Sequence, residues 1–397
     1  MVKPLTGIRI ADFTVHAAGP FCTHMLSQLG AECIKIESSL RPDIFRKPHA
    51  VYGRMGPASF DQVASNKLSV RINLKDAKGV DLAKRLVEVS DVASESFRPG
   101  VMDRLGLGYE TLSAIKPSLV MVSVSSSGQF GPDAHFAGYA PLFGAWGALG
   151  YLTGYADGPP VEMRHVMDHS VGMNAAMATL AAVYRQRRTG AGCHVDVGAR
   201  EVAASLAGEA LLLAAAGGAP FRMGNEHPRM APHGVYRTRD LDRWLTIAVS
   251  SDAVWTRLVE LIKRPDLQRD ERFSTEALRH ANRAALDIEM ERWTGAQEAG
   301  AAADALQKVG VAAHVSFTIR DIVNDDHLRE RGMVIDVDDM AGDSRAALSV
   351  PVRFSRSATG LDRGTPLLGE DEEYVFGELL GIGCAERAAL VEACVIY

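Results

Sequence analysis

The sequence predicts an α/β protein whose first half forms a parallel sheet with covering helices. Two observations support this: short apolar strand patterns alternate with helical patterns, and glycines follow the ends of the helical patterns. Alternation of this kind favours parallel strands joined by helical crossovers, a Rossmann-like arrangement. The chain has 397 residues, of which 47% are hydrophobic. This length and composition predict two to three domain-sized units with a large core.

The expected elements of the first half follow one another in order. Strand patterns cover 8–13, 33–36, 68–74, 91–93 and 119–124, and helical patterns cover 18–29, 80–87 and 109–115. After the first strand the chain reads Thr14-Val15-His16-Ala17-Ala18-Gly19-Pro20, which lacks the GxGxxG fingerprint of dinucleotide-binding proteins. The expected sheet therefore does not by itself indicate a nicotinamide cofactor.

The pattern changes near residue 220. Segments 235–237 and 244–249 are typical of a hairpin, and helical patterns follow at 255–262, 285–293 and 301–309. From about residue 330 the chain returns to strand and loop character. A second, smaller α/β unit is therefore expected after residue 220.

Charge and composition disfavour several partners and sites. The net charge is −6 and no long basic block occurs, which disfavours nucleic acids and anionic membranes. The most apolar stretch, 210–221, is too short to span a bilayer, and no signal peptide is recognised, so a cytoplasmic location is expected. The five cysteines form no CxxC pair and the histidines show no ligand spacing, so neither disulfides nor a metal site is expected.

Asp168 stands just before a helical pattern that ends at Gly190. The ordinary interpretation is a helix N-cap, since a carboxylate there accepts backbone N–H bonds. The alternative is a nucleophilic carboxylate whose charge the helix N-terminus stabilises. The two roles are compatible, so the residue is a candidate for either.

Two loops after expected strands are candidate ligand sites, because ligands bind at the carboxyl ends of parallel strands. They contain the Gly19-Pro20 turn and the Phe97-Arg98-Pro99-Gly100 turn. Arg98 and Arg104 could bind phosphates through paired N–H donors, or could be plain surface charges. His16 could act as a base or be simply polar.

A series of short motifs occurs in a fixed order along residues 5 to about 380. They are Asp12-Phe13-Thr14 through Ala18-Gly19-Pro20, Leu29 through Glu37, Asn66-Lys67-Leu68-Ser69, Phe97-Arg98-Pro99-Gly100 through Tyr109, Ser127-Gly128-Gln129-Phe130-Gly131-Pro132, Asp168, Arg188 through Gly192 with Val195-Asp196-Val197, and Leu368-Gly369-Glu370. In this order they resemble the class III CoA transferases. That group contains carnitine-CoA, formyl-CoA and benzylsuccinate CoA transferases, and also α-methylacyl-CoA racemase.

The resemblance implies a fold and an assembly. A large Rossmann-like, CoA-binding domain is expected from residues 1–200 and 330–397, and a small α/β domain from 225–325, with linkers at 201–224 and 326–330. Two chains are expected to interlock like linked rings in a homodimer. Each active site would then lie between the large domain of one chain and the small domain of its partner.

The resemblance also implies site residues. Asp168 matches the nucleophile, and Tyr139 matches a tyrosine beside the thioester. The positions that contact CoA fall on His16, Asn73, Lys75, Phe97, Arg98, Arg104 and Leu105. Ala17 stands where some formyl-CoA transferases have a glutamine that binds the acyl oxygens, and Ser96 and Ala140 also depart from the pattern. These departures favour an acceptor other than oxalate or formate, with a larger or more apolar shape.

The expected function is transfer of CoA from an acyl-CoA donor, with succinyl-CoA as a candidate, to a carboxylic acid. The resemblance implies an aspartyl anhydride and an aspartyl-CoA thioester at Asp168, with the CoA thioester as substrate and no tightly bound cofactor. One alternative is an α-methylacyl-CoA racemase, although its loop histidine is replaced by Ala137-Gly138-Tyr139-Ala140 and His135 is out of register. Another is a subunit of a hetero-oligomeric CoA transferase.

Overall fold

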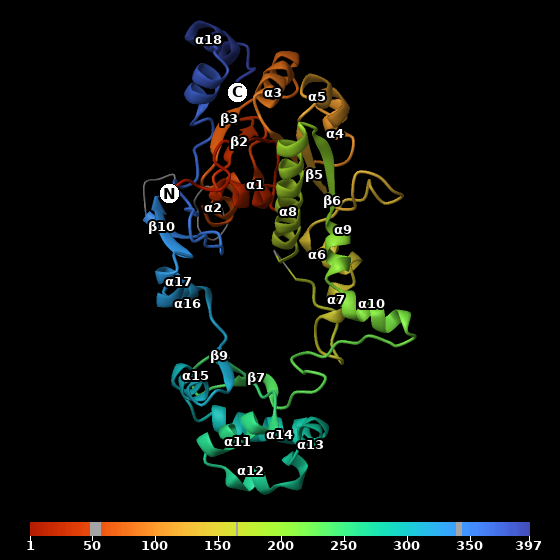
Figure 1. Cartoon of the computed structure of the whole chain (residues 1–397), viewed down its shortest axis with the longest axis vertical. Coiled ribbons are helices and arrows are strands. Elements are labelled where there is room, and N and C mark those ends of the chain that lie inside the picture. Colours follow the sequence, from red (N-terminus) through yellow and green to blue (C-terminus); the bar gives the residue numbers. More distant parts are fainter. Residues whose placement is uncertain (48–56, 164–165, 339–343) are drawn as a thin grey trace. The chain divides into compact units, whose positions relative to one another are not determined.

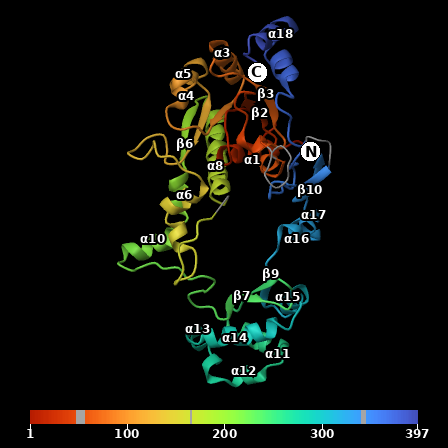
Figure 2. The same cartoon turned by 180° about the vertical axis from the view of Figure 1, so that it is seen from behind.

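The computed structural model describes residues 1–47, 57–163, 166–338 and 344–397 (Figures 1 and 2). The chain divides into two compact units. The first contains Met1–Gly150, Glu162–Ala219 and Asp325–Tyr397, and the second contains Tyr151–Val161 and Pro220–Asn324. In the described residues no helix combines the length and the apolar character needed to cross a membrane.

A six-stranded parallel sheet forms the centre of the first unit, in the order β3-β2-β1-β4-β5-β6. Its strands are β1 (Arg9–Asp12), β2 (Glu32–Glu37), β3 (Leu68–Arg71), β4 (Val92–Glu95), β5 (Val120–Ser125) and β6 (Cys193–Gly198). The expected α/β class and the first five strands are confirmed, with borders that differ by one to three residues. The sixth strand was expected only as a motif around Val195.

Helices cover both faces of this sheet. On one face α1 (Ala18–Gln28) and α8 (Val166–Thr189) bury Leu26, Met167 and Val171 against Val122. On the other face α3 (Ala77–Glu88) and α5 (Tyr109–Ile115) contribute Leu82 and Leu112, together with Phe376 from the C-terminal segment. The remaining helices of the first unit are η1 (Ile44–Arg46), α2 (Pro57–Ala64), α4 (Val101–Arg104), α6 (Ala140–Trp146), α9 (Ala199–Ser205), α10 (Gly208–Ala215), α17 (Asp326–Glu330), η3 (Glu373–Leu379) and α18 (Cys384–Glu392). The short helix α7 (Leu149–Leu152) lies at the border between the two units.

The second unit has its own sheet and core. The antiparallel strands are β7 (His233–Arg237), β8 (Trp244–Ala248) and β9 (Ala312–Val315), so the predicted hairpin is confirmed. Trp255, Phe273 and Leu286 are buried between this sheet and the helices. The helices are α11 (Asp252–Leu261), α12 (Pro265–Arg269), η2 (Glu271–Phe273), α13 (Glu276–Ala281), α14 (Arg283–Thr294), α15 (Ala299–Lys308) and α16 (Ile319–Val323). A separate hairpin, β10 (Val334–Asp338) with β11 (Ser344–Leu348), belongs to the first unit.

The bounds of the two compact units differ in detail from those expected for the two domains. That these units are a CoA-binding domain and an inserted small domain stays a prediction. Tyr151–Val161 belongs to the second unit because Arg222 donates hydrogen bonds to the carbonyls of Tyr151, Tyr155 and Gly158 at 3.0–3.2 Å. The expected linkers at 201–224 and 326–330 are also partly helical, since they contain α10 and α17.

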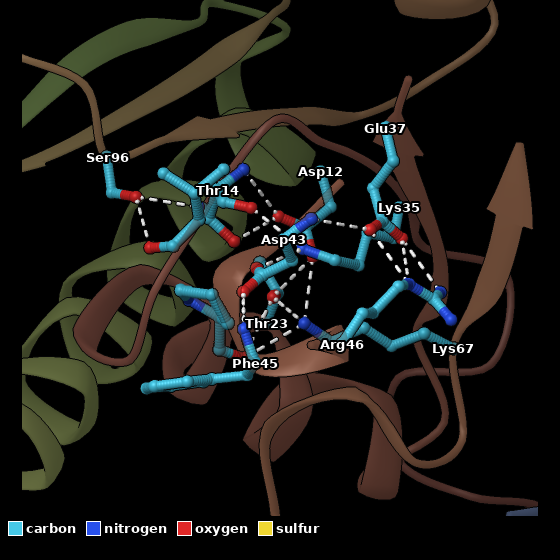
Figure 3. A network of polar contacts seen from close by, with 12 residues as sticks. Asp12, Thr14, Thr23, Lys35, Glu37, Asp43, Phe45, Arg46, Lys67 and Ser96 are labelled. Atoms are coloured by element: carbon cyan, nitrogen blue, oxygen red, sulfur yellow. Dashed lines mark hydrogen bonds and ion pairs between the residues drawn. The ribbon is translucent and has the colours of Figure 1, made fainter. Parts of the chain in front are cut away.

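Charged side chains are buried beneath the carboxyl ends of β1 and β2 (Figure 3). Lys67 Nζ donates to Asp12 Oδ2 at 2.9 Å, and Lys35 Nζ donates to Asp43 Oδ2 at 3.2 Å, with all four side chains fully buried. Burial alone would raise the pKa of Asp12, but the charges of Lys67 and Lys35 lower it below the usual range. Both ion pairs are therefore charged parts of the core.

Replacing Lys67 by methionine leaves the Asp12 carboxylate buried without its principal cation. We expect a loss of about 3–5 kcal/mol in the free energy of unfolding of Lys67→Met, measured by urea denaturation. The matched control is Lys84→Met, whose partner Asp81 is exposed and 3.9 Å away, and it should change stability by less than about 1 kcal/mol. Equal stability of the two variants would contradict the central role of the buried pair.

Candidate active site

A cavity of about 170 Å³ lies at the carboxyl ends of the strands of the six-stranded sheet. The loop after β1, the turn after β4, the loop after β5 and the first turn of α8 all line it. Six residues predicted for the site are brought together there: His16, Ala17, Phe97, Arg98, Tyr139 and Asp168.

The position of this cavity follows from the strand order. From β1 the chain passes to α1 on one face of the sheet, and from β4 it passes to α4 and α5 on the other face. Adjacent parallel strands whose connections leave on opposite faces open a crevice between them, which is where ligands bind in such sheets. The cavity therefore occupies the expected ligand position of the fold.

Asp168 lies in the first turn of α8, inside the helix, so the expectation that it stands just before the helix was wrong. The buried Met167 and Val171 anchor this turn in the core. Gly172 lets α8 approach the start of α1 closely, because a Cβ there would lie 2.7 Å from the carbonyl oxygen of Ala18. The partial positive charge of a helix N-terminus stabilises a carboxylate in this position.

His16 adopts a left-handed backbone conformation, with φ of 68°. Such a conformation is uncommon for a residue other than glycine, and it marks a loop whose shape the surrounding contacts hold. The His16 ring lies edge-on to the Tyr139 ring, with 6.3 Å between centroids. Both side chains are exposed at the cavity and available to a ligand.

Glu95 supports the Phe97-Arg98 turn from below. Its Oε2 accepts a hydrogen bond from the Phe97 N–H at 2.7 Å, and the residue is 3% exposed. Burial raises the pKa of Glu95 to about 7, although hydrogen bonds from Ser123 and the Phe97 amide act in the opposite direction. A carboxyl group that titrates near neutral pH therefore holds the backbone of this turn.

Four predicted CoA contacts do not line the cavity. Asn73 and Lys75 follow β3, where Asn73 Oδ1 accepts from the Lys75 N–H and Asn73 Nδ2 donates to the carbonyl of Cys394. Arg104 ends α4, and Leu105 packs against the core of that face. The segments that carry them follow the carboxyl ends of β3 and β4, the same ends of the sheet strands at which the cavity lies. Their role in binding CoA stays a prediction.

Sequence reasoning missed several residues of the cavity wall. Ser125, Ser126, Phe136 and Phe143 line it but were not predicted for the site. The available signal was the position of the serines directly after the expected strand at 119–124. Among the described residues, no group of three or more histidine, cysteine, aspartate or glutamate side chains is placed to hold a metal ion.

The raised pKa of Glu95 predicts a pH effect on stability. Between pH 4.5 and about 7 the folded protein keeps a proton that an unfolded glutamate has lost, so this stabilisation is complete below pH 4.5 and disappears as the pH rises through 7. Glu95→Gln keeps an acceptor for Phe97 without titrating. Relative to it, the wild type should lose about 3 kcal/mol of unfolding free energy between pH 4.5 and 8. Parallel pH curves from urea denaturation would contradict this.

Comparisons with known proteins identify the family. Residues 5–372 match the model of CoA-transferase family III. The chain is 33% identical to a succinyl-CoA–D-citramalate CoA-transferase of Chloroflexus aurantiacus, over 96% of this chain and 95% of that protein. It is 35% identical to an acetyl-CoA:oxalate CoA-transferase of Acetobacter aceti, over 84% of this chain and 85% of that protein.

A solved structure is similar as well. The crystal structure of a CaiB/BaiF family protein from Brucella suis superposes with a TM-score of 0.87 at 33% identity, covering 96% of this chain and all of the other. The resemblance inferred from the ordered motifs is thereby confirmed. The chain belongs to CoA-transferase family III and is an enzyme of that class.

Proposed function

We propose that this enzyme moves CoA from an acyl-CoA donor to a carboxylic acid, with Asp168 as the nucleophile. The observation that carries the proposal is the gathering of Asp168, His16, Phe97 and Arg98 around one cavity at the switch point of the sheet. Succinyl-CoA is the first donor to test, since it appears in the name of the Chloroflexus relative.

The proposed cycle begins with attack of the Asp168 carboxylate on the thioester carbonyl of the donor. The CoA thiolate leaves, and an aspartyl anhydride with the donor acid remains. The thiolate then attacks the aspartyl carbonyl of this anhydride, which releases the donor acid as a carboxylate and forms an aspartyl-CoA thioester. Covalent catalysis of this kind divides one difficult exchange into easier steps.

The second half of the cycle reverses these steps with the acceptor. The acceptor carboxylate attacks the aspartyl thioester, and the CoA thiolate leaves again. The thiolate attacks the acyl carbonyl of the new anhydride, which gives the product thioester and restores Asp168. Activation is conserved throughout, so neither ATP nor a tightly bound cofactor is required. Both intermediates react with water, so the cavity has to exclude it.

The wall of the cavity supports an acceptor with apolar surface. Ala17, Ala137, Phe136 and Phe143 contribute apolar side chains around Asp168. Ala17 offers no hydrogen bond to acyl oxygens, in contrast to a glutamine. The proposal therefore favours D-citramalate-like or larger acids over oxalate as acceptors.

The proposal includes an interlocked homodimer in the cytoplasm, with a large domain from both chain ends and an inserted small domain. Exposed apolar side chains support an interface between chains. Helix α10 has no buried residue, and its Leu211 and Leu212 are 67% and 73% exposed, while Met177 on α8 is 65% exposed. Large exposed apolar side chains such as these favour burial against another chain.

A racemase would need a base beside the α-carbon of the substrate. Of the histidines discussed for this role, His16 lines the cavity and His135 does not. His16 comes from the loop after β1, and the loop segment expected to carry the racemase histidine supplies Ala137 and Tyr139 instead. Transfer through Asp168 therefore remains the better supported function.

Asp168→Asn removes the nucleophile while keeping the size of the side chain. We expect transfer from succinyl-CoA or acetyl-CoA to fall by about 10⁴-fold or more, with CoA binding retained. Hydroxylamine trapping followed by peptide mass spectrometry should find the donor-dependent modification on Asp168 in the wild type alone. Asp81→Asn, at an exposed site, is the matched control and should stay active. Turnover by Asp168→Asn would refute the assignment, and deuterium entering at the α-carbon without an acceptor would support a racemase.

Light scattering of the purified chain should give the mass of two copies. Leu212→Asp places a charge on the apolar surface of α10 and should shift the population toward monomer, with loss of transfer. A wild-type chain that is monomeric and inert until a related chain is added would instead indicate a hetero-oligomeric transferase.

A further inference from the structure

The loop after β1 is fixed at both of its ends by buried groups. At the first end, Lys35 Nζ donates to the carbonyl of Thr14 at 2.9 Å, and Asp12 accepts from the Thr14 N–H at 3.0 Å. At the other end, Lys67 Nζ donates to the carbonyl of Pro20 at 3.0 Å. These contacts fix where the loop leaves the sheet and where it enters α1.

The middle of the loop is held by a single side chain of the neighbouring segment. The Val15 N–H donates to Ser96 Oγ at 2.9 Å, and the same hydroxyl donates to the Val15 carbonyl at 3.0 Å. Figure 3 shows Ser96 reaching this loop from the segment that follows β4. One hydroxyl thus satisfies both the donor and the acceptor of one residue, as a paired strand would do.

These bonds continue the ladder between β1 and β4 beyond the strand ends. The last backbone bond of that ladder runs from the Phe13 N–H to the Ser94 carbonyl at 2.8 Å. Beyond this bond the segments that follow β1 and β4 diverge toward opposite faces of the sheet, so their backbones no longer pair. The Ser96 hydroxyl supplies the next hydrogen bonds between the two segments, in the lining of the cavity.

Close packing at Gly19 reinforces the same contact. A Cβ on Gly19 would lie 2.8 Å from the Cβ of Ser96 and 2.8 Å from the Thr14 methyl group. No side chain would therefore fit at position 19 while the loop and the turn lie this close together. Loss of the hydroxyl removes the bonds that keep them there, while the packing alone sets only a lower limit to their separation.

We propose that the Ser96 hydroxyl is a positioning group that sets the width of the cavity, by fixing the loop that carries His16 to the turn that carries Phe97 and Arg98. The inference rests on the proposed function, because it takes the cavity as the site for CoA thioesters. Ser96 itself performs no chemical step. It keeps the two ligand-binding segments at the separation that a CoA thioester requires, so its removal affects binding more than reaction at Asp168.

The test compares Ser96→Ala and Ser96→Thr with the wild type, using coenzyme A as the probe in calorimetry. Loss of the hydroxyl should weaken CoA binding about tenfold, while the rate of Asp168 acylation at saturating succinyl-CoA changes less than about threefold. Ser96→Thr keeps the hydroxyl and should restore binding. The matched control is Ser90→Ala, which removes a buried hydroxyl bonded to the Leu86 carbonyl at the opposite end of β4 and should leave binding unchanged.

Amide hydrogen exchange of the ligand-free proteins gives a second, independent result. In Ser96→Ala the peptide containing Val15 and His16 should exchange about tenfold faster, because the Val15 N–H has lost its acceptor. Unchanged exchange, or CoA binding equal to that of the wild type, would overturn the proposal. If the wild type neither binds CoA nor transfers it, the proposed function fails, and faster exchange in Ser96→Ala then still establishes the contact itself.

Discussion

The carboxylate of Asp12 sits fully buried in the middle of the first unit, where an unpaired charge would be strongly destabilising. Lys67 neutralises it, and Thr14 and Thr23 donate further hydrogen bonds to its oxygens. The same groups hold the backbone of the loop that begins at Thr14. The contacts that neutralise Asp12 therefore also fix the loop after β1. A change that frees the Asp12 carboxylate would release that loop as well.

The residues of the candidate site come from elements that are held with different rigidity. Asp168 comes from a long helix packed on the sheet, whereas His16 and Arg98 come from loops on two different strands. A helix anchored by Met167 and Val171 keeps its first turn in place with little freedom. The loops depend instead on a few hydrogen bonds, from Ser96 on one side and Glu95 on the other. In the proposed mechanism the nucleophile thus stands on the rigid element, and the proposed ligand contacts stand on the adjustable ones.

Much of the fold could be predicted from local pattern. Strands such as β5 are buried and rich in valine, and α1 and α3 carry apolar residues at helical spacing. β6 gave a weaker signal because it is an edge strand with alternating exposure. The start of α8 was placed too late because the pattern suggested a cap at Asp168, whereas Met167 already packs in the core.

The candidate site was predictable only in part. Ordered motifs identified six residues that the structure places around one cavity, but they gave no indication of what holds those residues in place. The contacts that do so join segments about 80 residues apart, as between Val15 and Ser96, or about 55 apart, as between Asp12 and Lys67. Pairings at this range depend on the topology of the sheet, which local sequence does not encode.

The path of the chain has a consequence for biosynthesis. One face of the large sheet is covered partly by Val375, Phe376 and Ile396, and Asn73 donates its backbone N–H to the carbonyl of Val395. On the ribosome these residues emerge only after the whole of Pro220–Asn324, which at 5–20 residues per second takes roughly 5–20 s. During that interval one apolar face of the nascent sheet stays partly uncovered. Chaperone contact with the growing chain is expected at that stage, before the final segment arrives to cover it.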